Sequence, residues 1–176
     1  RGNSSRHFIK LGYSLNFVDD TDANVSHSVM GMDPHHEWVL HGPILDKTLI
    51  RNYVWYNVAG EVMDYAPNVR FCEAFINGEY MGLYLMVESV TAGDNDSRLQ
   101  LSINRKNNTF TGYCLRVDDG SNEIKDLNTF SMYTYQTEGV VDSVYPGTSN
   151  LTPEMKARIQ KDFSAFERIL YSGDYN

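Results

Sequence analysis

Two stretches of the chain repeat apolar residues at the spacing of an α-helix. The first begins after Asp46, a residue type that caps helix N-termini, and ends at Ala66-Pro67. Its apolar positions are Leu49, Ile50, Tyr53, Val54 and Val58. The second begins after Thr152 as the cap, with Pro153 in the first helical position, and stops at Gly173. Its apolar stripe is Met155, Ile159, Phe163, Phe166 and Leu170. The pattern predicts two helices, the second of them amphipathic.

Runs rich in apolar residues predict β-strands around these helices. They cover residues 8–18, 37–41, 71–76, 79–88 and 111–117. Polar, turn-rich loops lie at residues 19–32, 92–98 and 118–128. The order is strand, loop, strand, helix, hairpin and crossing segment, and then the C-terminal helix. This order predicts an α+β fold, in which the first helix packs Leu49 and Tyr53 against a sheet that carries residues 71–75.

A hairpin between the third and fourth runs is the strongest local prediction. Asn77-Gly78 tolerates the positive φ that both central positions of a type I′ turn require. A two-residue loop places Ile76 opposite Glu79, and simple alternation then places Phe71 opposite Tyr84. Both faces of this ribbon are largely apolar, so we expect a central element that is covered on both sides.

Charge and length narrow the possible partners. The formal net charge is −8 at pH 7. Nucleic acids are bound through clustered Lys and Arg, and no basic run offsets the acidic background, which excludes a nucleic acid as partner. No stretch approaches the roughly 18 apolar residues that span a bilayer, so we expect no membrane span. The 176 residues are enough for a single domain with its own core.

Cysteines and histidines give no metal site. Cys72 and Cys114 are the only cysteines, and both lie in strand-like runs, either as buried free thiols or as a pair if those strands meet. His35-His36-Glu37 is a poor zinc site because adjacent histidines on a loop point apart and a third spaced ligand is lacking. The acidic clusters lack the spacing of a calcium loop and are typical of solvated turns.

Five segments, in their order and spacing, resemble the CotH family of spore-coat-type proteins, whose fold is an atypical protein kinase. The segments are Arg1-Gly2-Asn3-Ser4-Ser5, Trp38-Val39-Leu40, the run from Asp46 to Asn52, Ala66-Pro67, and the run from Ile76 to Glu88. The resemblance extends over nearly the whole chain and covers the front part of the family's domain. It implies a small lobe at about residues 1–90, and a linking region with the start of the large lobe at about residues 91–176.

The N-terminal segment holds most of the residues that the resemblance places at a nucleotide. Arg1, Asn3, Ser4 and Ser5 flank a flexible glycine and offer hydroxyls and backbone N–H groups, which suit a phosphate cradle. Lys10 follows as the cation that phosphates require on a neighbouring strand. The alternative for Lys10 is a surface lysine on an edge strand. Without the resemblance the signal is weak, because no glycine-rich or Walker-type motif is present.

Arg51 and Glu88 complete the candidate nucleotide site. Arg51 falls in the family's Asp-x-Thr-x-Leu/Ile-Arg-Asn pattern, where it contacts phosphate or fixes the helix by pairing with an acid such as Glu88 or Asp64. Glu88 ends the hairpin at the point where a kinase chain crosses to its large lobe and contacts adenine. Its carboxylate accepts a hydrogen bond from the nucleotide, pairs with a cation, or is an exposed acid beside the hinge.

Two functions follow from the resemblance. The first is the nucleotide-binding front portion of an atypical protein Ser/Thr kinase that uses ATP and Mg²⁺, with its metal-binding aspartates downstream of this chain. The second is a non-catalytic interaction module in spore-coat or cell-surface assembly. Both imply a bacterial protein that is extracellular, on the cell surface or in the spore coat, with a protein substrate or a coat protein as partner. We expect the 176 residues alone to be catalytically inactive.

Overall fold

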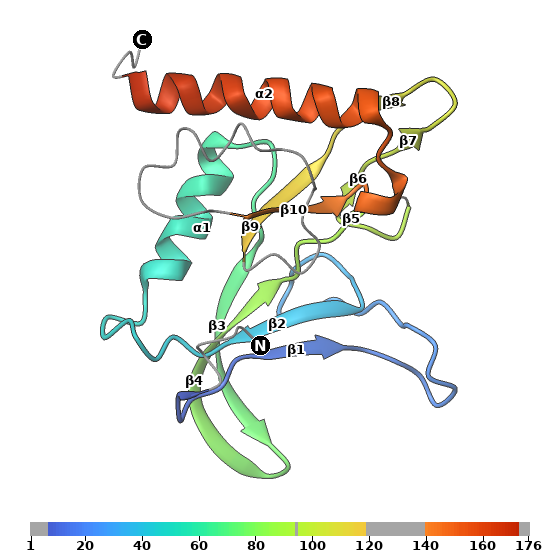
Figure 1. The fold of residues 1–176 in the computed structure, drawn as a ribbon. Coiled ribbons are helices and arrows are strands. Elements are labelled where there is room, and N and C mark those ends of the chain that lie inside the picture. The colour runs from blue at the N-terminus through green and yellow to red at the C-terminus, as the bar shows by residue number, and fades with distance from the viewer. Residues whose placement is uncertain (1–6, 94, 119–139, 173–176) are drawn as a thin grey trace. The chain divides into compact units, whose positions relative to one another are not determined.

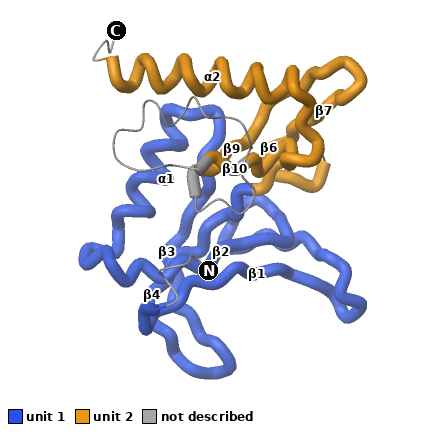
Figure 2. The backbone as a smooth tube through the Cα atoms, in the orientation of Figure 1, with its two compact units in different colours: residues 1–90 blue, residues 91–176 orange. Residues whose placement is uncertain are grey.

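The computed structural model describes residues 7–93, 95–118 and 140–172 (Figure 1). Its backbone divides into two compact units, residues 1–90 and residues 91–176 (Figure 2). The predicted α+β class is confirmed, because the described residues contain an antiparallel sheet with a packed helix and a long C-terminal helix.

The first unit is built on a four-stranded antiparallel sheet in the order β1-β2-β4-β3. The strands are β1 (Tyr13–Asn16), β2 (Glu37–His41), β3 (Val69–Ile76) and β4 (Glu79–Glu88), and the helix between β2 and β3 is α1 (Arg51–Val62). The strand predicted over residues 8–18 is shorter than expected, whereas the one at residues 37–41 has its predicted bounds. The predicted central position of the hairpin holds for only one of its strands: β4 lies between β2 and β3, whereas β3 is an edge strand of the sheet.

Each face of this sheet carries its own apolar cluster. On one face Leu40, Ala74 and Tyr84 are buried. On the other face Val69, Leu85 and Val87 are buried, and α1 covers them with its two tyrosines, Tyr53 and Tyr56. The Tyr53 ring stacks on the Phe71 ring with 4.8 Å between centroids, which confirms the predicted packing of the helix. A helix without one fully buried residue is thus held through two aromatic side chains.

The hairpin turn is confirmed, but the predicted strand register is wrong. Asn77 and Gly78 both have positive φ, at 52° and 84°, and Ile76 pairs with Glu79. Beyond the next pair, a β-bulge at Met81-Gly82 inserts one residue into β4, with Gly82 at φ 85°. The partner of Tyr84 is therefore Cys72 and not Phe71. Phe71 pairs with Leu85 instead.

The first helix begins four residues later than its capping signal indicated. Asp46 is not the N-cap residue, which is Ile50. Its Oδ1 accepts hydrogen bonds from the Thr48 hydroxyl and N–H in a local turn, and its Oδ2 accepts the N–H of Arg51, the first residue of α1. Leu49 has φ 62°, which no helix accommodates, and it lies half-buried outside α1. Leu49 is therefore not the helical core residue that the pattern predicted.

The second unit is organised around α2 (Pro153–Ser172), which begins at Pro153 as predicted, with the Met155 N–H bound to the Thr152 hydroxyl at 3.3 Å. Its described residues also form three two-stranded sheets. Their strands are β5 (Ala92–Gly93) with β6 (Leu99–Gln100), β7 (Ile103–Asn104) with β8 (Thr109–Phe110), and β9 (Cys114–Asp118) with β10 (Val140–Tyr145). A short 3₁₀ helix, η3 (Thr148–Asn150), precedes α2. The strand predicted at residues 111–117 corresponds to β9, which begins three residues later.

Only the first half of the predicted α2 stripe is core. Met155 and Ile159 are fully buried against Phe110, Val141 and Leu151. Phe166 and Leu170, at the other end of the predicted apolar stripe, are 56% and 45% exposed. Cys72 and Cys114 are free thiols. The predicted turn-rich segment at residues 118–128 lies almost entirely outside the described residues.

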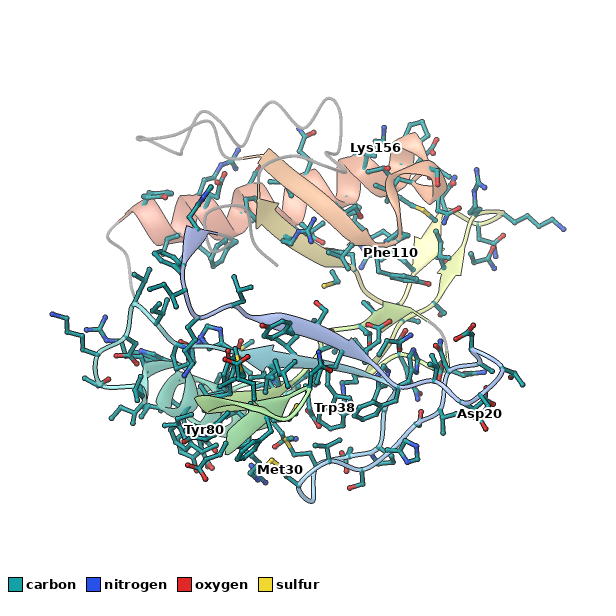
Figure 3. All side chains as sticks on the ribbon, turned by 90° about the horizontal axis from the view of Figure 1, so that it is seen from below. Asp20, Met30, Trp38, Tyr80, Phe110 and Lys156 are labelled. Carbon is teal, nitrogen blue, oxygen red and sulfur yellow. The ribbon has the colours of Figure 1, made fainter. Side chains whose placement is uncertain are left out.

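Trp38 is the largest residue buried completely in the first unit (Figure 3). Its indole Nε1 donates a hydrogen bond of 2.8 Å to the carbonyl oxygen of His35. The indole thereby ties the loop before β2 to the sheet, since the polar end of a buried Trp needs such an acceptor.

Candidate functional site

A cavity of about 440 Å³ opens in the first unit, beside β1, β2 and the start of α1. Its apolar lining comes from Phe8 before β1, from Tyr13 in β1, from Val39 in β2, and from residues 43–45 in the loop after β2. The side chains of its polar lining are Lys10, Ser14, His41, Asp46, Arg51 and Asn52. Two of the candidate site residues, Lys10 and Arg51, therefore share one cavity although 41 positions separate them in the sequence.

Lys10 is fitted closely between two glycines and a tyrosine ring. Its Nζ lies 4.5 Å from the centroid of the Tyr84 ring, a cation–π contact. A Cβ on Gly42 would lie 2.9 Å from the Lys10 Cγ and 3.1 Å from the Tyr84 ring, so only glycine leaves room for this side chain. A Cβ on Gly82 would lie 3.4 Å from Nζ. Lys10 is thus more constrained than a surface lysine on an edge strand.

Arg51 pairs with an acid, but with Asp46 and not with Glu88 or Asp64. The Arg51 Nε lies 3.5 Å from Asp46 Oδ1, and the Arg51 N–H donates to Asp46 Oδ2 at 2.8 Å. The pKa of Asp46 is lowered, first by the Thr48 hydroxyl and then by the Arg51 and Thr48 N–H groups and the guanidinium charge. Sequence reasoning passed over Asp46 as a site residue, although Asp46-x-Thr48 is the signature of a local side-chain turn.

Glu88 lies apart from the residues that line the cavity. It is buried, which rules out the exposed acid considered for this position. Its Oε2 accepts hydrogen bonds from the Asn68 N–H at 2.9 Å and from the Asn68 side-chain amide at 3.2 Å. These contacts join the ends of β3 and β4. The other candidates, Arg1, Asn3, Ser4 and Ser5, lie outside the described residues.

Comparison with known protein families identifies the family of the chain. A family model described as CotH kinase protein matches residues 1–169. The chain belongs to the CotH family. Neither the curated proteins nor the solved structures gave a match.

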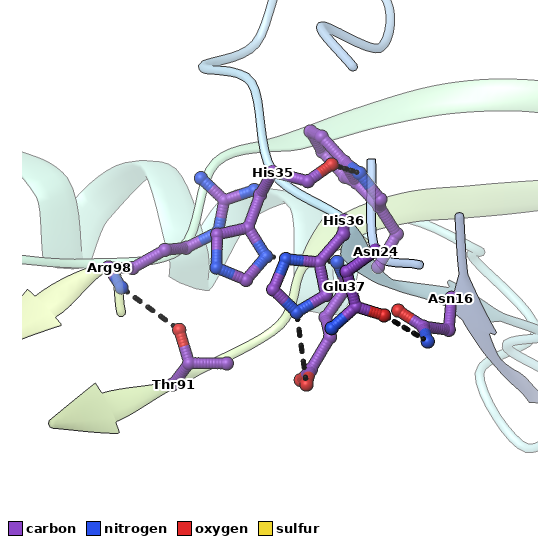
Figure 4. A network of polar contacts seen from close by, with 8 residues as sticks. Asn16, Asn24, His35, His36, Glu37, Thr91 and Arg98 are labelled. Carbon is purple, nitrogen blue, oxygen red and sulfur yellow. Dashed lines mark hydrogen bonds and ion pairs between the residues drawn. The ribbon is translucent and has the colours of Figure 1, made fainter. Parts of the chain in front are cut away.

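The described part of this CotH chain contains no cluster of three or more His, Cys, Asp and Glu side chains suited to a metal ion. His35 and His36 do not point apart as expected: both are buried, and their rings stack with 4.5 Å between centroids. His36 Nε2 lies 3.7 Å from the Glu37 carboxylate (Figure 4). His35 Nδ1 accepts a hydrogen bond of 2.9 Å from the Glu37 N–H. This hydrogen bond uses the lone pair with which Nδ1 would bind a metal ion. Among the described helices, none has the length and apolar character needed to cross a membrane.

The buried ring of Tyr84 predicts a stabilising substitution. Its hydroxyl has no hydrogen-bond partner among the described residues, and burial raises the pKa of this phenol. Tyr84→Phe keeps the ring under Lys10 and removes the unsatisfied group, so we expect unfolding to cost about 1 kcal/mol more. Urea unfolding of both proteins measures this. Tyr80→Phe is the control, since its exposed hydroxyl already donates to Glu73. Destabilisation by Tyr84→Phe would mean that the hydroxyl has a partner.

His41 gives the cavity a predicted pH response. Burial lowers the pKa of this imidazole below its usual value of 6.5. The unfolded chain then takes up the proton first as the pH falls through about 6.5, so acidification from pH 7.5 to 5.5 weakens folding through His41. We expect His41→Gln to lose less unfolding free energy over this interval than the parent chain. Equal losses in the two proteins would contradict this, and chemical denaturation at both pH values measures them.

Proposed function

We propose that this CotH chain is the nucleotide-binding front portion of an atypical protein Ser/Thr kinase. The observation that carries the proposal is the single cavity that brings Lys10 and Arg51 together. Phosphates bind where cations converge, Lys acting as a point charge and Arg as a planar fork. The rest of the lining, which includes Phe8, Val39 and Ile44, offers the apolar surface that a nucleoside needs.

The size of the cavity agrees with this ligand class. Small-molecule sites have volumes of roughly 300–1,000 Å³ and combine an apolar lining with a few placed polar groups. A cavity of about 440 Å³ with two cations, a carboxylate and an imidazole on its wall has this composition. The chain as a whole is acidic, with a formal net charge of −8. The presence of two cations on the wall of one cavity is therefore not a consequence of a generally basic surface.

Phosphoryl transfer also needs carboxylates that hold Mg²⁺ and orient the acceptor hydroxyl. The described residues do not fit that role, because their acids form no cluster of metal ligands. We therefore assign no catalytic step to this chain, and we propose that the catalytic aspartates belong to the continuation of the protein. The substrate would be a Ser or Thr of a protein partner in the spore coat or outside the cell.

Two assays test this function. In the first, the 176-residue chain is titrated with ATP by calorimetry, and we expect measurable binding. In the second, the chain and a longer protein containing the downstream aspartates are incubated with labelled ATP and an acceptor protein. We expect phosphorylation only by the longer protein. Absence of ATP binding by both proteins would refute the proposal, and transfer by the 176 residues alone would show that the acids are within them.

One observation favours the second candidate, a non-catalytic interaction module. The helix α1 exposes large apolar side chains, with Trp55 at 69% and Val62 at 77%. Exposed apolar residues that share an element are a common feature of protein-binding surfaces. An interaction module would retain partner binding without ATP and would show no loss on substitution of Lys10.

A further inference from the structure

The carboxylate of Asp46 holds both the backbone and the side chain of Arg51. Oδ2 accepts the Arg51 N–H, and Oδ1 lies beside the Arg51 Nε. The Asp46 side chain is only 10% exposed, whereas that of Arg51 is 73% exposed. A buried carboxylate is costly unless hydrogen bonds satisfy it, and here Thr48 and Arg51 satisfy both oxygens. The buried acid thus fixes the base of an exposed arginine.

The point of contact on the guanidinium matters. A guanidinium has five N–H donors, of which Nε carries one and the two terminal nitrogens carry four. Asp46 contacts Nε, so the terminal pair, which grips phosphate in a bidentate manner, is not used in the ion pair. The carboxylate also offsets part of the repulsion between Lys10 and Arg51, the two cations that line the cavity.

Backbone hydrogen bonds explain only part of the role of this acid. Thr48 uses Oδ1 in a local turn, and the N–H of Arg51, the first residue of α1, uses Oδ2. Neither of these contacts requires a negative charge, since neutral side-chain oxygens accept backbone N–H groups as well. The contact that depends on the charge is the ion pair between Oδ1 and the Arg51 Nε.

We propose that Asp46 is a positioning residue, which holds the Arg51 guanidinium at the cavity for the phosphates of the bound nucleotide. This inference rests on the proposed function and adds to it the role of a group that does not itself touch the ligand. It predicts that the loss of Asp46 weakens contacts to phosphate and leaves contacts to the nucleoside intact.

The test is calorimetric titration of the 176-residue chain and its Asp46→Asn variant with ATP, inorganic triphosphate and adenosine. Asparagine retains one acceptor for the turn and removes the charge and the second acceptor. We expect about tenfold weaker binding of ATP and triphosphate, with adenosine affinity changed less than about twofold. In an Arg51→Gln background, Asp46→Asn should add less than about twofold. Glu61→Gln, the same charge change at an exposed site of α1, is the matched control and should alter nothing.

Each outcome of these titrations supports or overturns the proposed role of Asp46. Equal weakening for adenosine and ATP would make Asp46 a structural residue only and would overturn the inference. If Arg51→Gln weakens ATP binding but Asp46→Asn does not, the inference fails while the proposed function stands. A parent chain that binds no ATP refutes both. If circular dichroism shows that Asp46→Asn does not fold, Thr48→Val replaces it, because it removes one hydrogen bond to the same carboxylate. We then expect about threefold weaker ATP binding, and unchanged ATP binding would overturn the inference.

Discussion

Lys10→Met is expected to weaken ATP binding by the 176-residue chain at least about tenfold and, under the proposed function, to lower phosphorylation by the longer protein about a hundredfold. The reason is the loss of a cation that the cavity holds in a narrow space between Gly42 and the Tyr84 ring. Methionine has a similar length and remains packed on that ring, so the fold should be unaffected. Calorimetry and an ATP-dependent phosphorylation assay measure the two effects.

Lys47→Met is the matched control for this substitution. Lys47 lies in the turn before α1, is exposed, and does not line the cavity. It removes the same charge from the same unit, so a general electrostatic effect would weaken ATP binding in both variants. We expect unchanged binding and turnover for Lys47→Met. Equal activity of Lys10→Met and the parent protein would remove Lys10 from the site.

Trp38→Ala is expected to lower the free energy of unfolding by about 3–5 kcal/mol. The indole is completely buried and carries the hydrogen bond to the His35 carbonyl, so truncation leaves a cavity and removes that donor. A loss of this size is a large part of the roughly 5–15 kcal/mol that stabilises a domain, and it is expected to unfold much of the protein at 37 °C. Urea unfolding followed by circular dichroism measures it.

Trp55→Ala provides the comparison, because Trp55 is the only other tryptophan and is 69% exposed. We expect its effect on unfolding to stay within about 0.5 kcal/mol. Trp38→Phe should fall between the two, since it keeps most of the apolar volume and loses the donor. Similar losses for the two alanine variants would show that Trp38 is not the central packing residue of this sheet.

The parts of the fold that depend on a few adjacent residues could be predicted from the sequence. The Asn77-Gly78 turn follows from backbone conformations that few other residues adopt, and the start of α2 follows from Thr152-Pro153. The predicted register of β3 with β4 is wrong because simple alternation overlooks Gly82, and a glycine inside a strand-like run is a signal for a bulge. The predicted start of α1 is too early because Asp46 forms a local turn with Thr48, and Leu49, with φ 62°, separates this turn from the helix.

In the candidate site, too, the features set by adjacent residues could be predicted, whereas those set by distant contacts could not. Lys10 and Arg51 were recognised from a motif, whereas the cavity that they share forms only when β1, β2 and the loop before α1 come together. Gly42 carries no local signal, because its role is the space that it leaves for Lys10. The burial of Glu88 depends on Asn68, 20 positions earlier in the chain, which periodicity does not reveal.

The extra residue in the hairpin marks where β4 can change its length. Tyr80 pairs with Phe75 and Gly82 pairs with Ala74, so Met81 is the residue that has no partner in the pairing of β3 with β4. Removing Met81 would make this pairing regular and would leave Tyr84 opposite Cys72. Removing Leu83 would instead exchange every later side chain across the sheet, so that Leu85 would take the place of Tyr84 under Lys10. A deletion in this strand is therefore tolerated at the bulge and as disruptive as a core substitution two residues later.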